Sequence, residues 1–169
     1  DEYLSMLDWS VDQREHPVMI LIPGNQVTYR EADKDFDRLN HFKVEEAGEK
    51  VAILALGDFY QRGEQLSAKI KAELGFTPTL INPRFASGID KELLESLSER
   101  HQMVITMEDG ILSGGFGEKI ASFYGSSDMK VKNYGLEKKF YDRYDPNELL
   151  KEVGMTPAQI IADICNQLK

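Results

Sequence analysis

Hydrophobic positions recur along this chain with two periods, and each period predicts one kind of regular element. The first fourteen residues place apolar side chains at helical spacing, which predicts an amphipathic helix. Those side chains belong to Tyr3, Leu4, Leu7 and Val11. Residues 17–23 are a continuous apolar run bounded by prolines, which is typical of a strand buried on both faces. This helix and strand form half of an α/β unit, and we expect the other half upstream of Asp1.

A polar and charged stretch without a sustained period comes next. Residues 23–25 (Pro-Gly-Asn) predict a turn, and residues 26–40 are expected to be an interdomain linker. Residues 42–45 then alternate apolar with charged side chains, whereas residues 51–56 are apolar throughout. The short turn between these two runs predicts a hairpin whose half-exposed first strand lies at the edge of a sheet.

Strands and helices alternate over the remaining sequence. A helix is expected from about Gly57 to Leu74, with Gly75 as its C-terminal stop, and Asp90 is expected to cap the next helix. The other expected elements are strands at 79–82, 103–107 and 129–134, a helix ending near Tyr124, and helices at 146–153 and 156–168. This alternation predicts an α/β fold, with a mostly parallel five-stranded sheet, one antiparallel edge strand and helices on both faces.

The segment from Met103 to Ala121 joins a strand to a helix through two acidic residues and a glycine cluster. Glu108 and Asp109 are expected at the carboxyl end of the strand, which is the edge where ligands and partner domains usually meet an α/β fold. The glycines allow a sharp turn and a close approach of the helix start to its neighbours. They are Gly114, Gly115 and Gly117.

A glycine cluster before a helix is also the setting of phosphate-binding loops. No Lys-Ser/Thr pair follows these glycines, as a P-loop requires, and the spacing Gly-Gly-x-Gly differs from the dinucleotide fingerprint. The two carboxylates before the loop would also repel a phosphate by several kcal/mol at close range in a site of low dielectric. The favoured interpretation is therefore a tight structural or interface turn.

Composition and charge narrow the possible partners. A formal net charge of −9 disfavours nucleic acid and anionic membrane surfaces, and no apolar run has the length of a membrane span. The single cysteine, Cys165, lies in an apolar helical context and is expected to be a buried thiol in a reducing compartment, which indicates a cytoplasmic protein. Because the first residue is Asp1 and not Met, we expect a piece of a longer protein.

Candidate catalytic groups are few. His16, His41 and His101 have no Cys, His or carboxylate at ligand spacing, and each is expected to be structural or exposed. No Gly-x-Ser-x-Gly elbow, Cys-His motif or acidic metal loop is present in the sequence. The residues therefore predict an α/β domain with no catalytic, cofactor-binding or metal-binding group of its own.

Several runs of residues follow one another in a family-specific order. They are residues 48–54, Asn-Pro-Arg-Phe at 82–85 with Ile-Asp at 89–90, residues 106–117, Gly-Leu at 135–136 and residues 149–156. In this order they resemble the C-terminal domain of the transketolase superfamily, and within it most closely the 1-deoxy-D-xylulose 5-phosphate synthase family. The resemblance covers nearly the whole chain. Its most specific part is the Arg-Phe…Ile-Asp pattern combined with Glu-Asp…Gly-Gly-x-Gly.

The resemblance implies the C-terminal portion of a three-domain enzyme that uses thiamine diphosphate and Mg²⁺. That family condenses pyruvate with glyceraldehyde 3-phosphate, releasing carbon dioxide, in the synthesis of isoprenoid precursors. It implies that residues 1–25 end the middle, pyrimidine-binding domain, that residues 26–40 are a linker, and that residues 41–169 are the transketolase C-terminal domain. The cofactor site and the activating glutamate would lie upstream, so neither a cofactor nor activity is expected in this chain alone.

Two departures from the family pattern bear on substrate and surface. Synthases of this family usually carry Arg-Tyr-Pro-Arg-Gly, whose first arginine contacts the substrate phosphate, where this chain has Leu-Ile-Pro-Gly at 21–24. Leucine cannot replace a bidentate arginine. Arg30 is the remaining candidate for a phosphate contact, but the favoured interpretation is a solvated linker arginine. Residues 141–144 (Tyr-Asp-Arg-Tyr) replace a common His-Gly, which indicates a changed surface or interface.

A mechanical role is expected for the third domain. Glu108, Asp109 and the glycine loop would pack against the middle domain or a second protomer and so support a homodimer of the parent protein. The alternative is that the two carboxylates cap the following helix or face solvent. Two other functions stay open: a non-catalytic or divergent transketolase-like partner or regulatory module, and the β-type subunit of a 2-oxoacid dehydrogenase.

Overall fold

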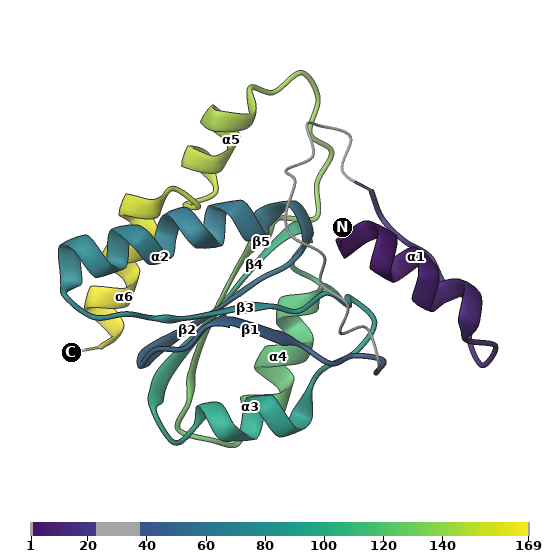
Figure 1. Ribbon diagram of the computed structural model, residues 1–169. Helices are drawn as coiled ribbons and strands as arrows, with labels where there is room; N and C mark the ends of the chain where they lie inside the picture. Colours follow the sequence, from purple (N-terminus) through teal and green to yellow (C-terminus); the bar gives the residue numbers. More distant parts are fainter. Residues whose placement is uncertain (1, 23–37, 169) are drawn as a thin grey trace.

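A five-stranded sheet with strand order β1-β3-β2-β4-β5 forms the centre of the computed structural model, which describes residues 2–22 and 38–168 (Figure 1). The strands are β1 (Lys43–Glu46), β2 (Lys50–Ala55), β3 (Thr79–Asn82), β4 (His101–Ile111) and β5 (Lys130–Leu136). Strands β2 to β5 pair in parallel, and β1 pairs antiparallel with β3 at one edge. The predicted mostly parallel sheet with one antiparallel edge strand is confirmed.

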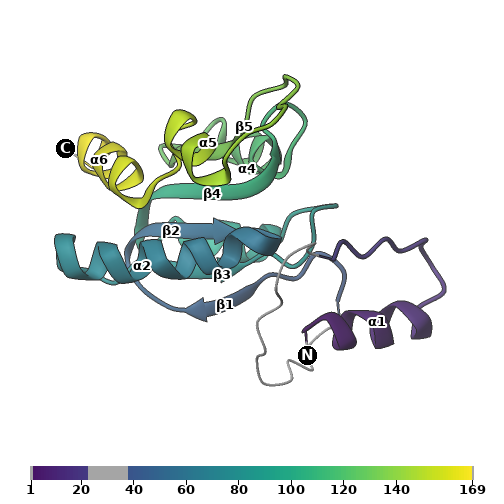
Figure 2. The ribbon, with the colours of Figure 1, turned by 90° about the horizontal axis from the view of Figure 1, so that it is seen from above.

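Helices cover both faces of this sheet, as the sequence predicts. The helices of the described residues are α1 (Glu2–Asp12), the short 3-10 helix η1 (Gly57–Phe59), α2 (Tyr60–Leu74), α3 (Lys91–Leu97), α4 (Phe116–Tyr124), α5 (Pro146–Glu152) and α6 (Pro157–Gln167). Helices α2 and α6 lie on one face, and α3 and α4 lie on the other (Figures 1 and 2). The predicted stop at Gly75 is confirmed, since its φ of 74° is left-handed, and Asp90 caps α3 by accepting the Leu93 N–H.

Strand β2 supplies side chains to both hydrophobic cores. Val51, Ile53 and Ala55 face α2 and α6, whereas Ala52 and Leu54 face α3 and α4. Successive side chains of a strand point to opposite faces, so the positions of a central strand that are covered on both faces, residues 51–55 in β2, are all apolar. This explains why residues 51–55 are apolar throughout.

The predicted hairpin between β1 and β2 is wrong. Strand β3 lies between them, antiparallel to β1 and parallel to β2. The connection from β1 to β2 crosses the start of β3 so closely that a Cβ on Gly48 would lie 2.1 Å from the Thr77 carbonyl oxygen. All four β3 residues are buried, so this strand needs a neighbour on each side, and that requirement overrides the tight turn in the sequence.

The predicted strand at residues 17–23 is also not formed. Residues 17–22 have no regular structure, the side chains of Met19 and Leu21 are 85% and 81% exposed, and Pro23 lies outside the described residues. A strand exists only through hydrogen bonds to a neighbour. No strand among residues 38–168 pairs with this segment, which therefore belongs to no sheet in the described part of the chain.

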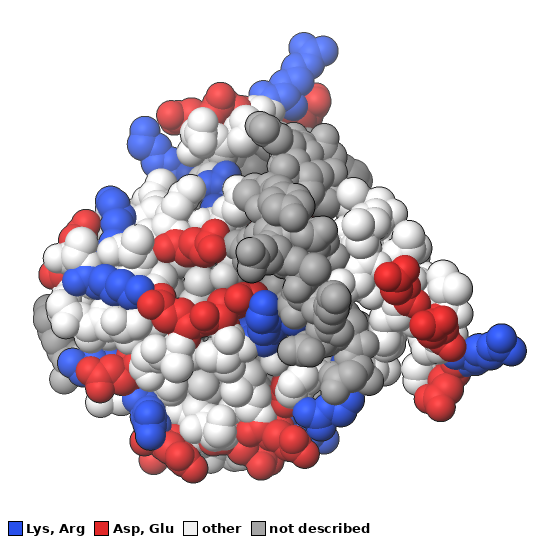
Figure 3. Space-filling model, in the orientation of Figure 1, with Lys and Arg blue, Asp and Glu red and all other residues white. Residues whose placement is uncertain are grey.

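Helix α1 is present as predicted, but it lies beyond the carboxyl end of the sheet and not on one of its faces (Figure 2). Trp9 packs edge-on against Phe85 with 5.6 Å between ring centroids, and Asn82 Nδ2 donates to Glu2 Oε1 at 2.9 Å. No α1 residue is buried. In the space-filling view, the surface over the upper part of this helix is largely uncharged (Figure 3).

Candidate functional site

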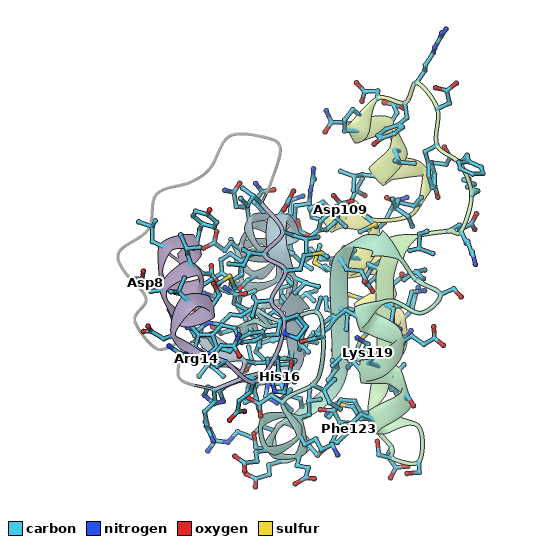
Figure 4. The ribbon with its side chains drawn as sticks, turned by 90° about the vertical axis from the view of Figure 1, so that its right-hand side faces the viewer. Asp8, Arg14, His16, Asp109, Lys119 and Phe123 are labelled. Atoms are coloured by element: carbon cyan, nitrogen blue, oxygen red, sulfur yellow. The ribbon has the colours of Figure 1, made fainter. Side chains whose placement is uncertain are left out.

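Strand β4 runs past its expected end at Met107 and carries the acidic pair into the sheet. Glu108 is only 5% exposed, whereas Asp109, the next residue, is exposed. Neighbouring residues of a strand point to opposite faces, so one carboxylate turns inward and the other outward. Figure 4 looks onto this edge of the sheet: α1, which carries Asp8, lies on one side, and α4, which carries Lys119 and Phe123, lies on the other.

The Glu108 carboxylate binds the start of α4. Its Oε2 accepts the Phe116 N–H at 2.9 Å, and its Oε1 accepts the Gly117 N–H at 2.8 Å. The first N–H groups of a helix have no partner within the helix and carry partial positive charge, so a carboxylate is a stabilising ligand there. The alternative that Glu108 caps the following helix is therefore confirmed. The place that a bound phosphate would need is taken by the protein's own side chain.

The glycine cluster is shaped around this carboxylate. Gly114 has a φ of 77°, which makes the sharp turn, and a Cβ on Gly115 would lie 2.8 Å from both Glu108 oxygens. A Cβ on Gly117 would lie 2.5 Å from Thr106 Oγ1, so this glycine lets α4 pack directly on β4. The predicted sharp turn and close helix packing are confirmed. Together they surround the Glu108 carboxylate.

The Asn-Pro-Arg-Phe run turns the chain at the end of β3 and holds α1. The Arg84 N–H donates to Asn82 Oδ1 at 3.1 Å, with Arg84 at a φ of 61°. Two residues of this run contact α1: Asn82 donates a hydrogen bond to Glu2, and Phe85 packs against Trp9. Sequence reasoning marked this run only through the family resemblance, because its contacts join parts of the chain about 80 residues apart.

Asp90 is a second buried carboxylate with several partners. It caps α3, accepts the Phe42 N–H through Oδ2 at 2.9 Å, and faces His41 Nδ1 at 3.0 Å. The cap was predicted, but the two contacts with residues 41 and 42 were not, since no periodic signal links positions so distant in the sequence. His41 and Asp90 also line a pocket of about 370 Å³ beside the start of β1. Asp90 thus fixes the chain where it enters the sheet.

His101 is structural, as expected for the three histidines. Its Nε2 lies 2.8 Å from Thr79 Oγ1, which also accepts the Gly48 N–H, and its Nδ1 lies 2.9 Å from the Leu97 carbonyl oxygen. Burial lowers the pKa of His101 from 6.5, against an opposing effect of the Leu97 hydrogen bond and with a smaller contribution from the charge of Arg100. The imidazole therefore joins β3, β4 and the end of α3 in its neutral form.

The other candidate positions are less informative. Arg30 and most of the predicted linker lie outside the described residues. Cys165 is half-buried and packs against the α2–α6 core, so the expected buried thiol is only partly enclosed. Within residues 2–22 and 38–168, no group of three or more His, Cys, Asp and Glu side chains is placed to hold a metal ion. Over the same ranges, no helix is long and apolar enough to cross a membrane.

These features define a class of protein: an α/β domain in which the buried polar groups Glu108, Asp90 and His101 bond to its own backbone and side chains, and Asn82 bonds to the N-terminal helix. Residues 40–160 match the family model "Transketolase, C-terminal domain", and the chain belongs to this family. It is 30% identical to a 1-deoxy-D-xylulose-5-phosphate synthase of Shouchella clausii over 99% of this chain and 27% of that protein. The synthase of Synechococcus sp. (strain JA-2-3B'a(2-13)) is 31% identical over 94% of this chain and 25% of that protein.

Solved structures support the same fold. A split gene transketolase, described as an inactive beta4 tetramer, superposes with a TM-score of 0.70 at 23% identity, covering 83% of this chain and 46% of that chain. A transketolase of Campylobacter jejuni gives a TM-score of 0.50 at 19% identity, covering 75% of this chain and 18% of that chain. This chain spans about a quarter of the length of the curated synthases that it matches.

Proposed function

We propose that this chain is the C-terminal portion of a thiamine diphosphate-dependent 1-deoxy-D-xylulose 5-phosphate synthase, and that it supports the enzyme without performing its chemistry. The observation that carries the proposal is the use of the synthase-like motif: Glu108 accepts two N–H groups at the start of α4, and the glycines around it allow α4 to pack on the sheet. The names of the matched synthases support the reaction class. Residues 1–25 then belong to the middle domain, residues 26–40 to a linker and residues 41–169 to the supporting domain.

The described residues do not fit the cofactor or its Mg²⁺. The N-terminus of α4 already holds the Glu108 carboxylate, which would repel a diphosphate, and within residues 2–22 and 38–168 no group of three or more His, Cys, Asp and Glu side chains is placed for a metal. Thiamine diphosphate, which supplies the chemistry by stabilising a carbanion, would therefore be held by upstream domains. Asp109 and the turn that follows it are exposed at the sheet edge and would contact those domains or a second protomer of a homodimer.

The second candidate is a divergent or non-catalytic transketolase-like partner or regulatory module. Leu21 stands where family synthases carry a phosphate-binding arginine, and it is 81% exposed. A synthase without that arginine would lose a charge-assisted contact to glyceraldehyde 3-phosphate. This residue favours an enzyme with another acceptor, or a partner protein without activity. The β-type subunit of a 2-oxoacid dehydrogenase is the third candidate.

Cofactor binding and activity of the intact polypeptide that contains this sequence distinguish these candidates. We expect the polypeptide to bind thiamine diphosphate with Mg²⁺ and to release carbon dioxide from pyruvate when glyceraldehyde 3-phosphate is added, whereas residues 1–169 alone do neither. Binding of the cofactor with release only for another acceptor indicates a divergent synthase. Absence of cofactor binding indicates the regulatory module. A polypeptide that begins with the middle domain indicates the dehydrogenase subunit.

A separate experiment tests whether the sheet edge that carries Asp109 supports the dimer. Reversing the charge of Glu108 would disturb α4 itself, so exposed Asp109 is the residue to change. We expect Asp109→Lys to weaken the dimer of the intact protein at least tenfold in sedimentation, because it alters a contact at the sheet edge. Asp128→Lys is the matched control, since Asp128 is exposed on the loop between α4 and β5. Equal dimerisation of both variants would contradict the role of this edge.

A further inference from the structure

The loop that joins β5 to α5, residues 137–145, projects from the sheet together with α5 (Figures 1 and 4). A pocket of about 310 Å³ lies between this loop and α5. Aromatic rings and carboxylates line the pocket, together with the buried side chain of Leu149. Neither Glu108 nor its glycines belong to this lining, so the pocket is separate from the sheet edge described above.

Two tyrosine rings form one corner of the pocket. Tyr141 and Tyr144 are nearly perpendicular, at 79°, with 6.2 Å between their ring centroids. The Tyr141 hydroxyl accepts the Glu137 N–H at 3.1 Å, which fixes this ring within its own loop, whereas Tyr144 is 54% exposed. The faces of aromatic rings carry negative partial charge and attract cations. The corner is therefore suited to a positively charged group.

The charged side chains that line the pocket are all acidic. They are Asp142, Asp145, Glu148 and Glu152. A metal ion would need several carboxylates that converge on one point, and no such group is placed within residues 2–22 and 38–168. An organic cation spreads its charge over several atoms, so carboxylates that do not converge can bind it together with the rings. The lining therefore favours an organic cation.

The chain itself places one cation on two of these groups. Lys139 Nζ lies 5.1 Å from the centroid of the Tyr141 ring and 3.3 Å from Glu152 Oε1. The hydrogen bond to Glu152 is the main cause that raises the pKa of Lys139, so its ammonium group stays charged at this place. Lys139 thus occupies Tyr141 and Glu152, whereas Tyr144 and Asp142 are exposed to an incoming group.

We propose that this pocket binds the guanidinium group of an arginine in a partner protein, with the group stacked on the Tyr144 ring and its N–H groups directed at Asp142 and Glu148. A guanidinium is planar and always charged, it stacks on aromatic rings, and its fork of N–H groups matches carboxylates. These properties fit the combination of rings and carboxylates better than the compact ammonium of a lysine does.

Phe140 indicates that the arginine belongs to a polypeptide. Its side chain also lines the pocket and is fully exposed. An apolar residue next to a bound arginine would cover this ring, whereas a small free cation would leave it in solvent. All of the groups involved lie within residues 137–152, so the inference goes beyond the proposed function and does not rest on it.

Calorimetric titration of the intact protein at low salt tests the ligand. The probes are the capped peptide Ala-Leu-Arg-Leu-Ala, its counterpart with lysine in the middle, and agmatine, which is a free alkylguanidinium. We expect the arginine peptide to bind about fivefold more tightly than either of the other two. Absence of binding by the arginine peptide would overturn the proposal. Equal affinity for the lysine peptide would overturn the choice of guanidinium, and equal affinity for agmatine would overturn the polypeptide source.

Variants of the aromatic residues locate the site. We expect Tyr144→Ala to weaken binding of the arginine peptide about fivefold, and Tyr144→Phe, which keeps the ring, to stay within about twofold. Phe140→Ser should reduce the advantage of the arginine peptide over agmatine. Tyr3→Ala is the control, since Tyr3 is an exposed tyrosine on α1. Unchanged thermal melting would show that each variant is folded, and wild-type affinity in Tyr144→Ala would refute the proposed site.

Lys139 provides a test in the opposite direction. Lys139→Ala removes the internal cation from Tyr141 and Glu152, and we expect it to tighten binding of the arginine peptide about threefold. Lys138→Ala removes the same charge from the neighbouring residue, which does not line the pocket, and should stay close to the wild-type affinity. Equal tightening in both variants would show a general effect of net charge and would contradict the part that the pocket plays.

Discussion

At the scale of single residues, Glu108 decides the geometry of the sheet edge. Replacing it with alanine leaves the buried N–H groups of Phe116 and Gly117 without an acceptor. We expect Glu108→Ala to lower the free energy of unfolding by about 2–4 kcal/mol, measured by urea denaturation.

Two matched variants separate this hydrogen bonding from a general effect of charge. Glu108→Gln keeps one carbonyl acceptor but turns an NH₂ donor toward the other N–H, so its loss of stability should be intermediate. Asp109→Ala removes the neighbouring, exposed carboxylate and should change the free energy of unfolding by about 0.5 kcal/mol or less. Equal losses for Glu108→Ala and Asp109→Ala would contradict the capping role.

His101 makes stability depend on pH. Its pKa is lowered in the folded state by burial, so between that value and 6.5 the unfolded chain binds more protons than the folded one. The contribution of His101 is fully present above pH 6.5 and declines as the pH falls through 6.5 toward the lower folded pKa. Urea denaturation from pH 7.5 to 5.5 should show this decline, and His101→Asn should flatten it.

The control for that titration is His16, which is exposed and lies outside the buried network. His16→Gln should keep the wild-type dependence of stability on pH. A flat wild-type profile, or an equal change in both variants, would show that His101 is not the group responsible.

At the scale of elements, close packing of α4 on β4 depends on Gly117. A Cβ at this position would meet Thr106 Oγ1 at 2.5 Å and Asn133 Cγ at 2.7 Å. We expect Gly117→Ala to push α4 away from the sheet and to cost about 1–3 kcal/mol of stability in thermal or urea unfolding. Gly125→Ala, at the other end of α4, adds a Cβ no closer than 3.4 Å and should be tolerated.

Sequence reasoning placed most strands and helices correctly because their signals are local. The apolar run of β2, the cap at Asp90 and the stop at Gly75 each act over a few residues. Pairing was predicted less well, since β1 lies beside β3 and not beside β2. A turn of few residues is compatible with both arrangements, and only the burial of β3 on all sides decides between them.

In the candidate site, too, features with local sequence signals were predicted, whereas features that depend on distant contacts were not. The acidic pair and the glycines were marked by composition, and their sharp turn was predicted from glycine alone. The inward orientation of Glu108 depends on β4 continuing to Ile111, and the pairing of β4 with β5 that holds this extension is not visible in either strand's sequence. The length of a strand depends on the strands that pair with it. The hydrogen bonds of Glu108 to the start of α4 therefore could not be predicted from the sequence.

At the scale of the whole molecule, α1 is attached through few contacts. Trp9 on Phe85 and Glu2 with Asn82 are the ones described above, and no α1 residue is buried. We expect Trp9→Ala to reduce hydrogen-exchange protection across α1 at least tenfold, while the unfolding of residues 38–168 stays unchanged. Leu7→Ala, on the outer face, should leave the protection of α1 as in the wild type. Equal loss in both variants would mean that α1 is held in another way.

The internal carboxylate at α4 has one more consequence. A loop that binds an anion from solution changes its conformation with the concentration of that anion. When the acceptor is a side chain of the same polypeptide, as Glu108 is, the helix N-terminus is always occupied. The surface formed by the loop around Glu108 therefore has the same shape at every anion concentration. This property fits a constitutive protein interface better than a ligand-regulated one.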